Sequence, residues 1–262
     1  MQYKLRPLIR LSIAAAISFL TIECVSAQSL FDVDFEAPLH EIGSEPATGT
    51  LGGPTSVVFG SPTVVEDSLL PSQSLEFQLP SSPPSNLNGL EQIRFQLGNE
   101  ASIYRVAFDL TFDSLVPAEF TGESFTLLFD TPRIQNLNFQ RFPGADEITI
   151  SVFQPTPNGP SISRNIGTAA NGELLQFEIE VDIEAQRWII NEGGTTLLNG
   201  DFFVSGDDLE SVRFSLSDRN SNGDSRVLLD NVQFSAIPEP SSLGVLLSIC
   251  VLGPAYRRRR SA

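Results

Sequence analysis

The stretch Tyr104-Arg105-Val106-Ala107-Phe108-Asp109-Leu110-Thr111-Phe112 decides the fold class. Successive side chains of a β-strand point to opposite faces, so the apolar side chains at every second position from Tyr104 to Phe112 share one face. A strand with a single apolar face must be covered by a second sheet. The stretch therefore predicts a two-sheet β-sandwich of the jelly-roll type.

Working outward from this stretch, short alternating runs recur between turns rich in Gly, Pro, Asn and Ser, with phenylalanine as the main aromatic residue. No window has a helical period, so we expect an all-β domain. The predicted strands are Leu75–Leu79, Ile93–Leu97, Tyr104–Phe112, Phe125–Phe129, Ile148–Phe153, Leu175–Ile183, Trp188–Ile190, Val212–Leu216 and Val227–Phe234.

The N-terminus has the pattern of an export signal. Basic residues Lys4, Arg6 and Arg10 precede an apolar stretch at 11–22, and Val25-Ser26-Ala27 follows it. Small or compact residues at the third and first positions before a cut are typical of a signal peptidase site. We therefore expect residues 1–27 to be a helical signal peptide that signal peptidase removes.

The C-terminus carries three ordered features: a Pro-Glu-Pro motif, a mostly apolar run at 243–255 and an arginine cluster. The residues concerned are Pro238, Glu239, Pro240, Arg257, Arg258, Arg259 and Arg260. The run is shorter than the roughly 20 apolar residues of a stable span, and the arginines favour its cytoplasmic end. An ordinary tail anchor is the alternative to a sorting segment that is held briefly and then cut.

In this order, residues 237–262 resemble the PEP-CTERM sorting signal. The resemblance implies a C-terminal transmembrane helix, cleavage near the motif by an exosortase, and cargo associated with extracellular polysaccharide. We expect the chain to pass through the inner membrane and to reach the cell surface or the extracellular matrix.

Between these segments, residues 28–236 suit one domain with a sizeable core. This part carries nine arginines, no lysine and 30 acidic residues, a net charge near −21. Nucleic acid and anionic membrane surfaces would be repelled, and divalent cations attracted.

The residues needed for several kinds of site are scarce in this domain. Both cysteines, Cys24 and Cys250, lie in the terminal segments, so the domain can form no disulfide. The single histidine, His40, makes a zinc centre or a Ser-His-Asp triad a poor expectation.

The segment 174–203 resembles laminin-G-like and concanavalin-like jelly rolls in its acidic strand, its turn and its strand bearing Trp188. Asp34-Phe35-Glu36 and Leu229-Asp230-Asn231-Val232 resemble the first and last strands of galactose-binding-type carbohydrate modules. The second resemblance implies a site that uses Glu36 and Asp230; alternatively, both residues simply begin or end strands. Trp188 could stack on a sugar, but beside Ile189 and Ile190 it is expected in the core.

Glu180-Val181-Asp182-Ile183-Glu184 matches the E-x-D-x-E pattern of laminarinase-like glycoside hydrolases. The resemblance would make Glu180 the nucleophile, Glu184 the acid/base and Asp182 their modulator. Those hydrolases line a sugar cleft with Trp and Tyr, whereas residues 28–236 contain one of each, Trp188 and Tyr104. The preferred interpretation is a strand with an acidic, solvated face.

A second motif follows the D-x-N-x-N-G spacing of calcium loops, whose alternate side-chain oxygens converge on one ion. Leu229 replaces the Glu that ends an EF-hand loop, which excludes an EF-hand. The alternative is a polar Asn-Gly hairpin turn. The candidate calcium ligands are Asp218, Asn220, Asn222, Asp224 and Asp230, the last from the following strand.

Together these features predict an exported, non-enzymatic surface or matrix protein that binds extracellular polysaccharide weakly. Its partners during export would be signal peptidase and an exosortase, and calcium would be its one candidate cofactor. The alternatives are a laminarinase-like hydrolase that uses Glu180 and Glu184, and a purely structural matrix component.

Overall fold

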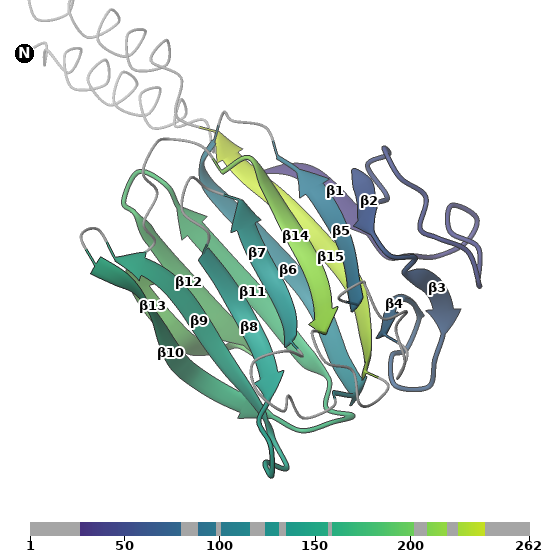
Figure 1. Ribbon diagram of the computed structural model, residues 1–262. Coiled ribbons are helices and arrows are strands. Elements are labelled where there is room, and N and C mark those ends of the chain that lie inside the picture. Colours follow the sequence, from purple (N-terminus) through teal and green to yellow (C-terminus); the bar gives the residue numbers. More distant parts are fainter. Residues whose placement is uncertain are drawn as a thin grey trace, which may run out of the picture. The chain divides into compact units, whose positions relative to one another are not determined.

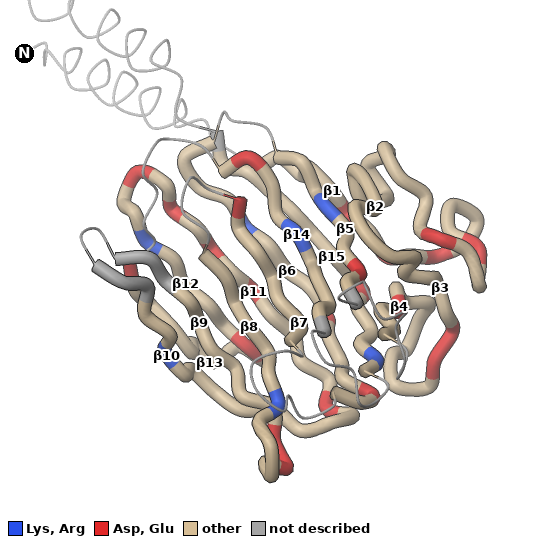
Figure 2. The backbone as a smooth tube through the Cα atoms, viewed as in Figure 1, with Lys and Arg blue, Asp and Glu red and all other residues tan. Residues whose placement is uncertain are grey.

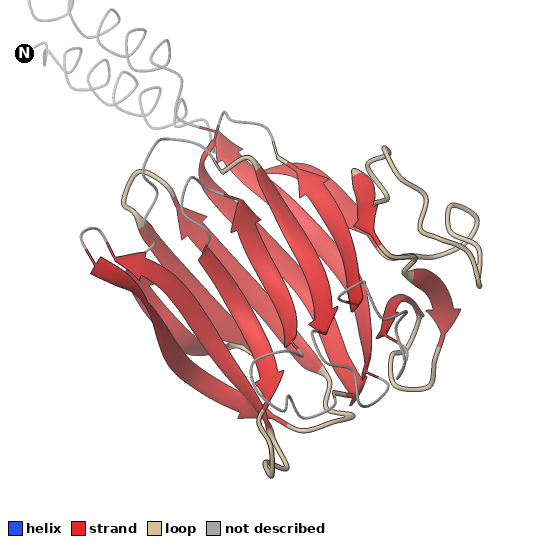
Figure 3. Ribbon diagram, viewed as in Figure 1, coloured by secondary structure: helices blue, strands red, loops and turns tan. Residues whose placement is uncertain are grey.

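The computed structural model describes residues 27–79, 89–97, 101–115, 124–130, 135–156, 159–201, 209–218 and 225–238. Residues 28–236 form one compact unit. The helices expected in the signal and sorting segments lie outside the described residues. Within the described ranges all regular structure is β (Figure 3). A search of the same ranges for an apolar helix of membrane-spanning length finds none.

The two sheets are antiparallel and stack as the layers of a sandwich (Figure 1). Sheet A has the strand order β13-β12-β11-β6-β15-β4-β3, with β1 also paired to β15, and sheet B has the order β10-β9-β8-β7-β14-β5-β2. The strands of sheet A are β1 (Gln28–Val33), β3 (Thr63–Glu66), β4 (Gln73–Leu79), β6 (Ala101–Ser114), β11 (Leu175–Asp182), β12 (Arg187–Glu192), β13 (Thr195–Asp201) and β15 (Ser225–Pro238). Those of sheet B are β2 (Ser56–Phe59), β5 (Gly89–Gln96), β7 (Ser124–Asp130), β8 (Gln135–Arg141), β9 (Ile148–Thr156), β10 (Gly159–Ala169) and β14 (Ser211–Asp218).

The core between the sheets is built largely from phenylalanine. Phe108 of β6 meets Phe214 of β14 with ring centroids 5.2 Å apart, and Phe77 of β4 meets Phe125 of β7 at 5.4 Å. Both pairs are edge-to-face contacts between the two sheets, a geometry that aromatic rings favour. The inward residues of the strands are thereby committed to the core, so function falls to the outward faces and the loops.

The predicted all-β sandwich is confirmed, and each predicted strand range falls on an observed strand. The predicted ranges leave out β1, β2, β3, β8, β10 and β13. β8 reads Gln-Asn-Leu-Asn-Phe-Gln-Arg, and amides have a low strand propensity. β10 begins Gly-Pro, which is tolerated because β10 is an edge strand of sheet B.

Candidate functional site

The outward side chains of four adjacent strands of sheet B, β5, β7, β8 and β14, form a polar face. Inward residues such as Phe125, Leu137 and Phe214 alternate with them in the core. The outward residues of these strands, called here the sheet B polar face, are Gln92, Arg94, Gln96, Ser124, Thr126, Leu128, Asp130, Asn136, Asn138, Gln140, Ser211, Arg213, Ser215 and Ser217. Hydroxyl and amide groups dominate this set, and such groups can exchange hydrogen bonds with sugar hydroxyls.

This face is less exposed than the outward face of an ordinary surface strand. Gln92 and Ser215 are each 4% exposed and Thr126 is 8% exposed, although all three point away from the core. On β11 of sheet A, by contrast, Gln176 and Glu178 are exposed. Polar groups withdrawn from solvent need partners, which makes such a face suited to a polar ligand.

Two arginines lie directly opposite each other on this face. Arg94 of β5 is the register partner of Arg213 of β14. Like charges in this position destabilise a sheet unless a counter-charge is present. Asp130 of β7 supplies it: its Oδ1 accepts from Arg213 Nη2, and its Oδ2 accepts from Arg94 Nη2 at 3.3 Å and from Ser211 Oγ at 2.6 Å.

The arginine pair has donor capacity left over. Arg94 Nε and Arg213 Nε are buried and have no hydrogen-bond partner within the described residues, and the same holds for Asn136 Oδ1. Arg213 Nη1 is 3.5 Å from Gln92 Oε1, and Thr126 donates to Asn138 Oδ1 at 3.0 Å. The two guanidinium groups and the carboxylate of Asp130 sum to a net charge of +1, and the other residues of the sheet B polar face are uncharged.

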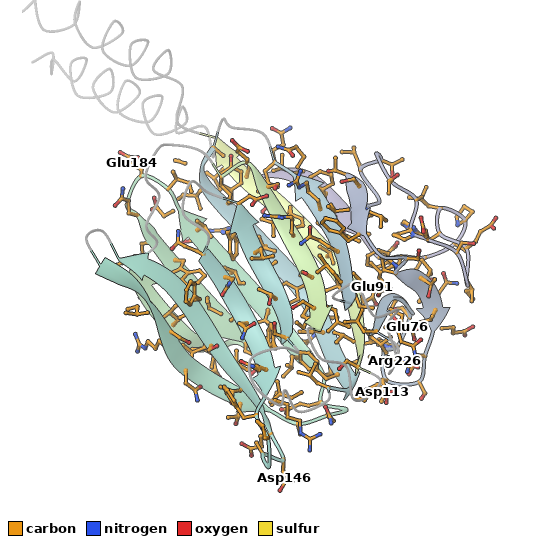
Figure 4. The ribbon with its side chains drawn as sticks, viewed as in Figure 1. Glu76, Glu91, Asp113, Asp146, Glu184 and Arg226 are labelled. Atoms are coloured by element: carbon orange, nitrogen blue, oxygen red, sulfur yellow. The ribbon has the colours of Figure 1, made fainter. Side chains whose placement is uncertain are left out.

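The E-x-D-x-E carboxylates lie on the other sheet and do not share one strand face. β11 ends at Asp182, so Glu184 lies in the following turn, exposed (Figure 4). Glu180 Oε2 accepts from Arg105 Nε of β6 at 2.9 Å, and Asp182 Oδ1 accepts from the Ala185 amide at 2.7 Å. The expectation that alternation places all three on one face is wrong, because the strand ends before the third carboxylate.

Most of the candidate calcium ligands lie outside the described residues. Asn220, Asn222 and Asp224 are among them, and Asp218 is described only as the last residue of β14. Asp230 is fully buried in β15, and Ser72 Oγ donates to it. Among the described residues no group of three His, Cys, Asp or Glu side chains could hold a metal ion. The calcium loop therefore stays a prediction.

Glu36 and Asp230 lie near each other in the fold. Asp230 belongs to β15, and Glu36 lies in the segment that follows β1. The backbone N–H of Gln73 donates to Glu36 Oε1 at 2.9 Å. The hydroxyl of the preceding residue, Ser72, donates to Asp230 Oδ2. Burial raises the pKa of Asp230 to about 6, and the nearby charges of Asp109 and Glu36 add to the shift.

Sequence reasoning missed an ion-pair cluster centred on Arg226 of β15. Arg226 binds Glu76 of β4, Asp113 of β6 at 2.9 Å and Asp67 at 2.7 Å (Figure 4). Although burial acts against the charge, hydrogen bonds to these three carboxylates raise the pKa of Arg226 above its usual value. Close by, burial raises the pKa of Glu91 to about 7, with the charge of Glu76 adding to the shift.

Trp188 and His40 have structural roles. Trp188 is fully buried and packs edge-to-face on Phe129, which confirms the core interpretation. His40 is buried in the β1–β2 loop, where its Nδ1 accepts from the Ala47 amide at 3.1 Å and its Nε2 lies 2.7 Å from the Gly52 carbonyl oxygen. The ring therefore ties this loop together.

Known proteins resemble the chain in fold only. No model of a protein family matches the sequence, and neither does any curated protein. A carbohydrate esterase of the Shiga toxin-encoding bacteriophage phi24B superimposes with a TM-score of 0.56 at 9% identity, covering 80% of this chain and 99% of that one. An endo-β-1,4-glucuronan lyase of the fungus Trichoderma reesei superimposes with a TM-score of 0.53 at 12% identity, covering 72% and 93%.

These comparisons correct the predicted function. The sequence predicted a non-enzymatic matrix protein, whereas both solved structures described above are glycan-active enzymes. The predicted non-enzymatic function is therefore overturned, and the comparisons favour its alternative, a glycoside hydrolase, over it. At such identities the likeness establishes the sandwich fold, so the activity has to be argued from the chain's own residues.

Proposed function

We propose that residues 28–236 form a polysaccharide-degrading enzyme that binds an acidic glycan along the sheet B polar face. One observation carries the proposal. Arg94 and Arg213 face each other across two strands and share the single carboxylate of Asp130. The positive charge that remains is matched by one carboxylate of a uronic acid, and guanidinium groups bind carboxylates in good geometry.

The rest of the face suits the remainder of the sugar. Gln92, Asn136 and Asn138 offer amides, which can both donate and accept, and Thr126 and Ser215 offer hydroxyls.

The reaction that fits this arrangement is elimination rather than hydrolysis. Glycoside hydrolysis uses a pair of carboxyl groups, and the described part of the sheet B polar face holds one, Asp130, which is engaged by two arginines. Neutralising the carboxylate of a uronic acid makes the neighbouring C–H more acidic, which is the first requirement for elimination. In the proposed step Asp130, the one carboxylate of the described face, would take this proton as the C–H and glycosidic C–O bonds break and the C=C bond forms, and would pass it to the leaving oxygen. The similar fold of the glucuronan lyase is consistent with this choice.

The acidic charge of the whole domain acts against such a substrate at long range. A net charge near −21 repels a polyanion. Salt screens that repulsion, with a Debye length of about 8 Å at physiological ionic strength, while the contact between a carboxylate and a half-buried arginine is screened much less. Turnover should therefore rise as salt is added at low ionic strength.

The test is an incubation of residues 28–236 with polyglucuronate, polymannuronate and a neutral mixed-linkage β-glucan. Elimination leaves an unsaturated uronate end that absorbs ultraviolet light, so absorbance and new reducing ends are measured together. The proposal expects both signals from a uronate polymer and neither from the glucan. No turnover of any uronate polymer, or reducing ends from the glucan without absorbance, would contradict it.

A matched pair of variants locates the activity. Arg213→Gln removes a strand arginine from the sheet B polar face, and Arg105→Gln removes one of the same kind, also paired with a carboxylate, from sheet A. Arg213→Gln should lower kcat/KM at least about tenfold, since losing one charged partner costs upwards of about 1.4 kcal/mol. Arg105→Gln should leave it unchanged.

We also propose that residues 237–262 act as a PEP-CTERM sorting signal, cut by an exosortase after export through the inner membrane. The ordered motif, apolar run and four arginines support this. Deleting Arg257–Arg260 should impair processing, because these charges would hold the short apolar segment in its orientation. Unchanged surface delivery of the shortened chain would refute the proposed role.

A further inference from the structure

A depression of about 290 Å³ lies on the opposite side of the molecule from the sheet B polar face, on the outer face of sheet A. Its lining includes the small side chain of Ala107 of β6 and polar residues of β6, β11 and β15. The polar lining residues are Asp109, Gln176, Glu178, Asn231 and Gln233. This volume is at the lower limit of ligand pockets, about 300–1,000 Å³, so it suits one small molecule rather than a polymer chain.

The carboxylate of Asp109 is held in a fixed orientation at the edge of the depression. Gln176, its register partner on β11, donates to Oδ1 at 3.1 Å, and Asn231 of β15 donates to Oδ2 at 2.8 Å. Each carboxylate oxygen keeps a further lone pair for a ligand. A half-buried carboxylate held from both sides is a preorganised hydrogen-bond acceptor.

Asn231 reaches this position through an irregularity in β15. Its φ is 51°, in the left-handed region, while Leu229 and Val232 on either side both point into the core. One extra residue is therefore accommodated, as in a β-bulge, and such bulges re-aim a side chain. The neighbouring Asp230 is buried, and its Oδ1 accepts from the backbone N–H of Asn231 at 2.7 Å.

A tight turn supplies one wall of the depression. Glu192 pairs with Thr195, so Gly193 and Gly194 alone form the loop, with φ of 53° and 78°. Two positive φ angles are the signature of a type I′ hairpin turn. The Gly193 amide donates to the Gln176 carbonyl at 3.0 Å, which fixes the turn against the start of β11.

The charges of the lining decide what can bind. Asp109 and Glu178 would repel an anion, so a uronate is excluded here, in contrast to sheet B. A divalent cation needs several oxygen ligands, and the described residues hold no group of three acidic, His or Cys side chains able to bind a metal. Hydroxyl groups both donate and accept, so they match one oriented carboxylate surrounded by amides.

We propose that this depression, named here the sheet A sugar site, binds a single neutral sugar unit, such as the end or a side branch of a glycan. It is separate from the sheet B polar face and does not depend on the activity proposed there. Asp109 and Asn231 bind vicinal hydroxyls, Gln176 and Gln233 close around them, and the small side chain of Ala107 leaves room for the ring.

The experiment follows the backbone amide resonances of Gly193, Gly194 and Asn231 during titration of residues 28–236 with glucose, galactose, mannose and their methyl glycosides. At least one sugar should shift these resonances in a saturable way. Asp109→Asn, which keeps size but removes the charged acceptor, should weaken binding at least about tenfold. Ala107→Leu should abolish it by filling the depression. Glu180→Gln, on the same sheet face, should bind like the wild type.

Three outcomes would overturn the proposal: no shift with any neutral sugar, wild-type binding by both site variants, or a response to calcium chloride that exceeds that to sodium chloride at equal ionic strength. The last would indicate a cation site. If Ala107→Leu does not fold, Asp109→Asn still tests the site, because Asn has nearly the same volume as Asp. Uronate turnover should be unchanged in both variants, so failure at this site and failure on sheet B are distinguishable.

Discussion

The outer faces of the two sheets differ in charge more than in shape. On the sheet B polar face the described strands β5, β7, β8 and β14 present two arginines, one aspartate and otherwise mostly amides and hydroxyls. Acidic residues lie on strands of sheet A and in many of the described loops (Figure 2). Those on the outer positions of β4, β6 and β11 are Glu76, Asp109, Asp113, Glu178, Glu180 and Asp182. The outer positions of these sheet A strands therefore carry a negative charge that the sheet B polar face does not.

The difference also separates stability from function. On sheet A the ion pairs of Arg226 join β15 to β4 and β6, so their loss should be felt in folding. The two arginines on sheet B share one carboxylate, so replacing either should weaken substrate binding more than it lowers stability. Four variants, with two controls, would sharpen or break this division.

The largest effect on stability is expected from Arg226→Ala. The substitution leaves Asp67, Glu76 and Asp113 close together without their shared counter-charge. Removing one partner of a largely buried ion pair costs several kcal/mol, and for Arg226, whose side chain is 22% exposed, we expect a loss of about 3 kcal/mol. Urea unfolding measures it.

Arg105→Ala is the control for that loss. Its pair with Glu180 is more exposed, with side-chain exposures of 55% and 35%, and surface pairs contribute about 0–1 kcal/mol. Equal losses for the two variants would show that the Arg226 cluster has no special role.

A smaller effect, dependent on pH, is expected from Glu91→Gln. The pKa of Glu91 is raised from 4.5 to about 7 in the folded domain, mainly by burial. The folded domain therefore favours the protonated form of Glu91. As pH rises from about 4.5 to about 7, the free energy of unfolding falls because this carboxyl must lose its proton while buried. Above pH 7 the loss of stability stays constant. Glu91→Gln should thus be more stable than the wild type at pH 8, on the order of 2 kcal/mol.

The difference between the two proteins should shrink as pH falls toward 5. Asp230, with a pKa raised to about 6, contributes a similar slope at lower pH, so the interval from about pH 6 to 7.5 isolates Glu91. Glu178→Gln, an exposed residue, controls for removing one negative charge from an acidic domain. Parallel pH profiles for the wild type and Glu91→Gln would refute the shift.

The smallest effect is expected from the carboxylates that the sequence motif singled out. Glu180 is engaged by Arg105 on sheet A, and Glu184 lies exposed in a turn. Glu180→Gln and Glu184→Gln should change turnover of any glycan less than about twofold. Loss of glucanase turnover in either variant would move the active site to sheet A.

Alternation alone was enough to predict the sandwich, because strands such as β6 carry their inward face in the sequence. It did not predict the sheet B polar face. Arg94 and Arg213 are more than 100 residues apart, and only the pairing of β5 with β14 makes them neighbours. Likewise the three partners of Arg226 come from separate segments.

The E-x-D-x-E motif misleads for a different reason. The E-x-D-x-E pattern assumes a strand that continues through Glu184, but the β11–β12 turn begins at Ile183, with Gln186 in the left-handed region. A local pattern cannot report where a strand stops when the turn residues are not Gly, Pro or Asn.

The central claim is that an acidic glycan binds across sheet B, and the side-chain Nε–H resonances of Arg94, Arg213 and Arg105 test it most directly. They are followed by nuclear magnetic resonance during titration with a uronate oligosaccharide too short to be cleaved. We expect the resonances of Arg94 and Arg213 to shift together and saturate, while that of Arg105 stays in place. A shift of Arg105 alone, or no shift of any of the three, would contradict the account.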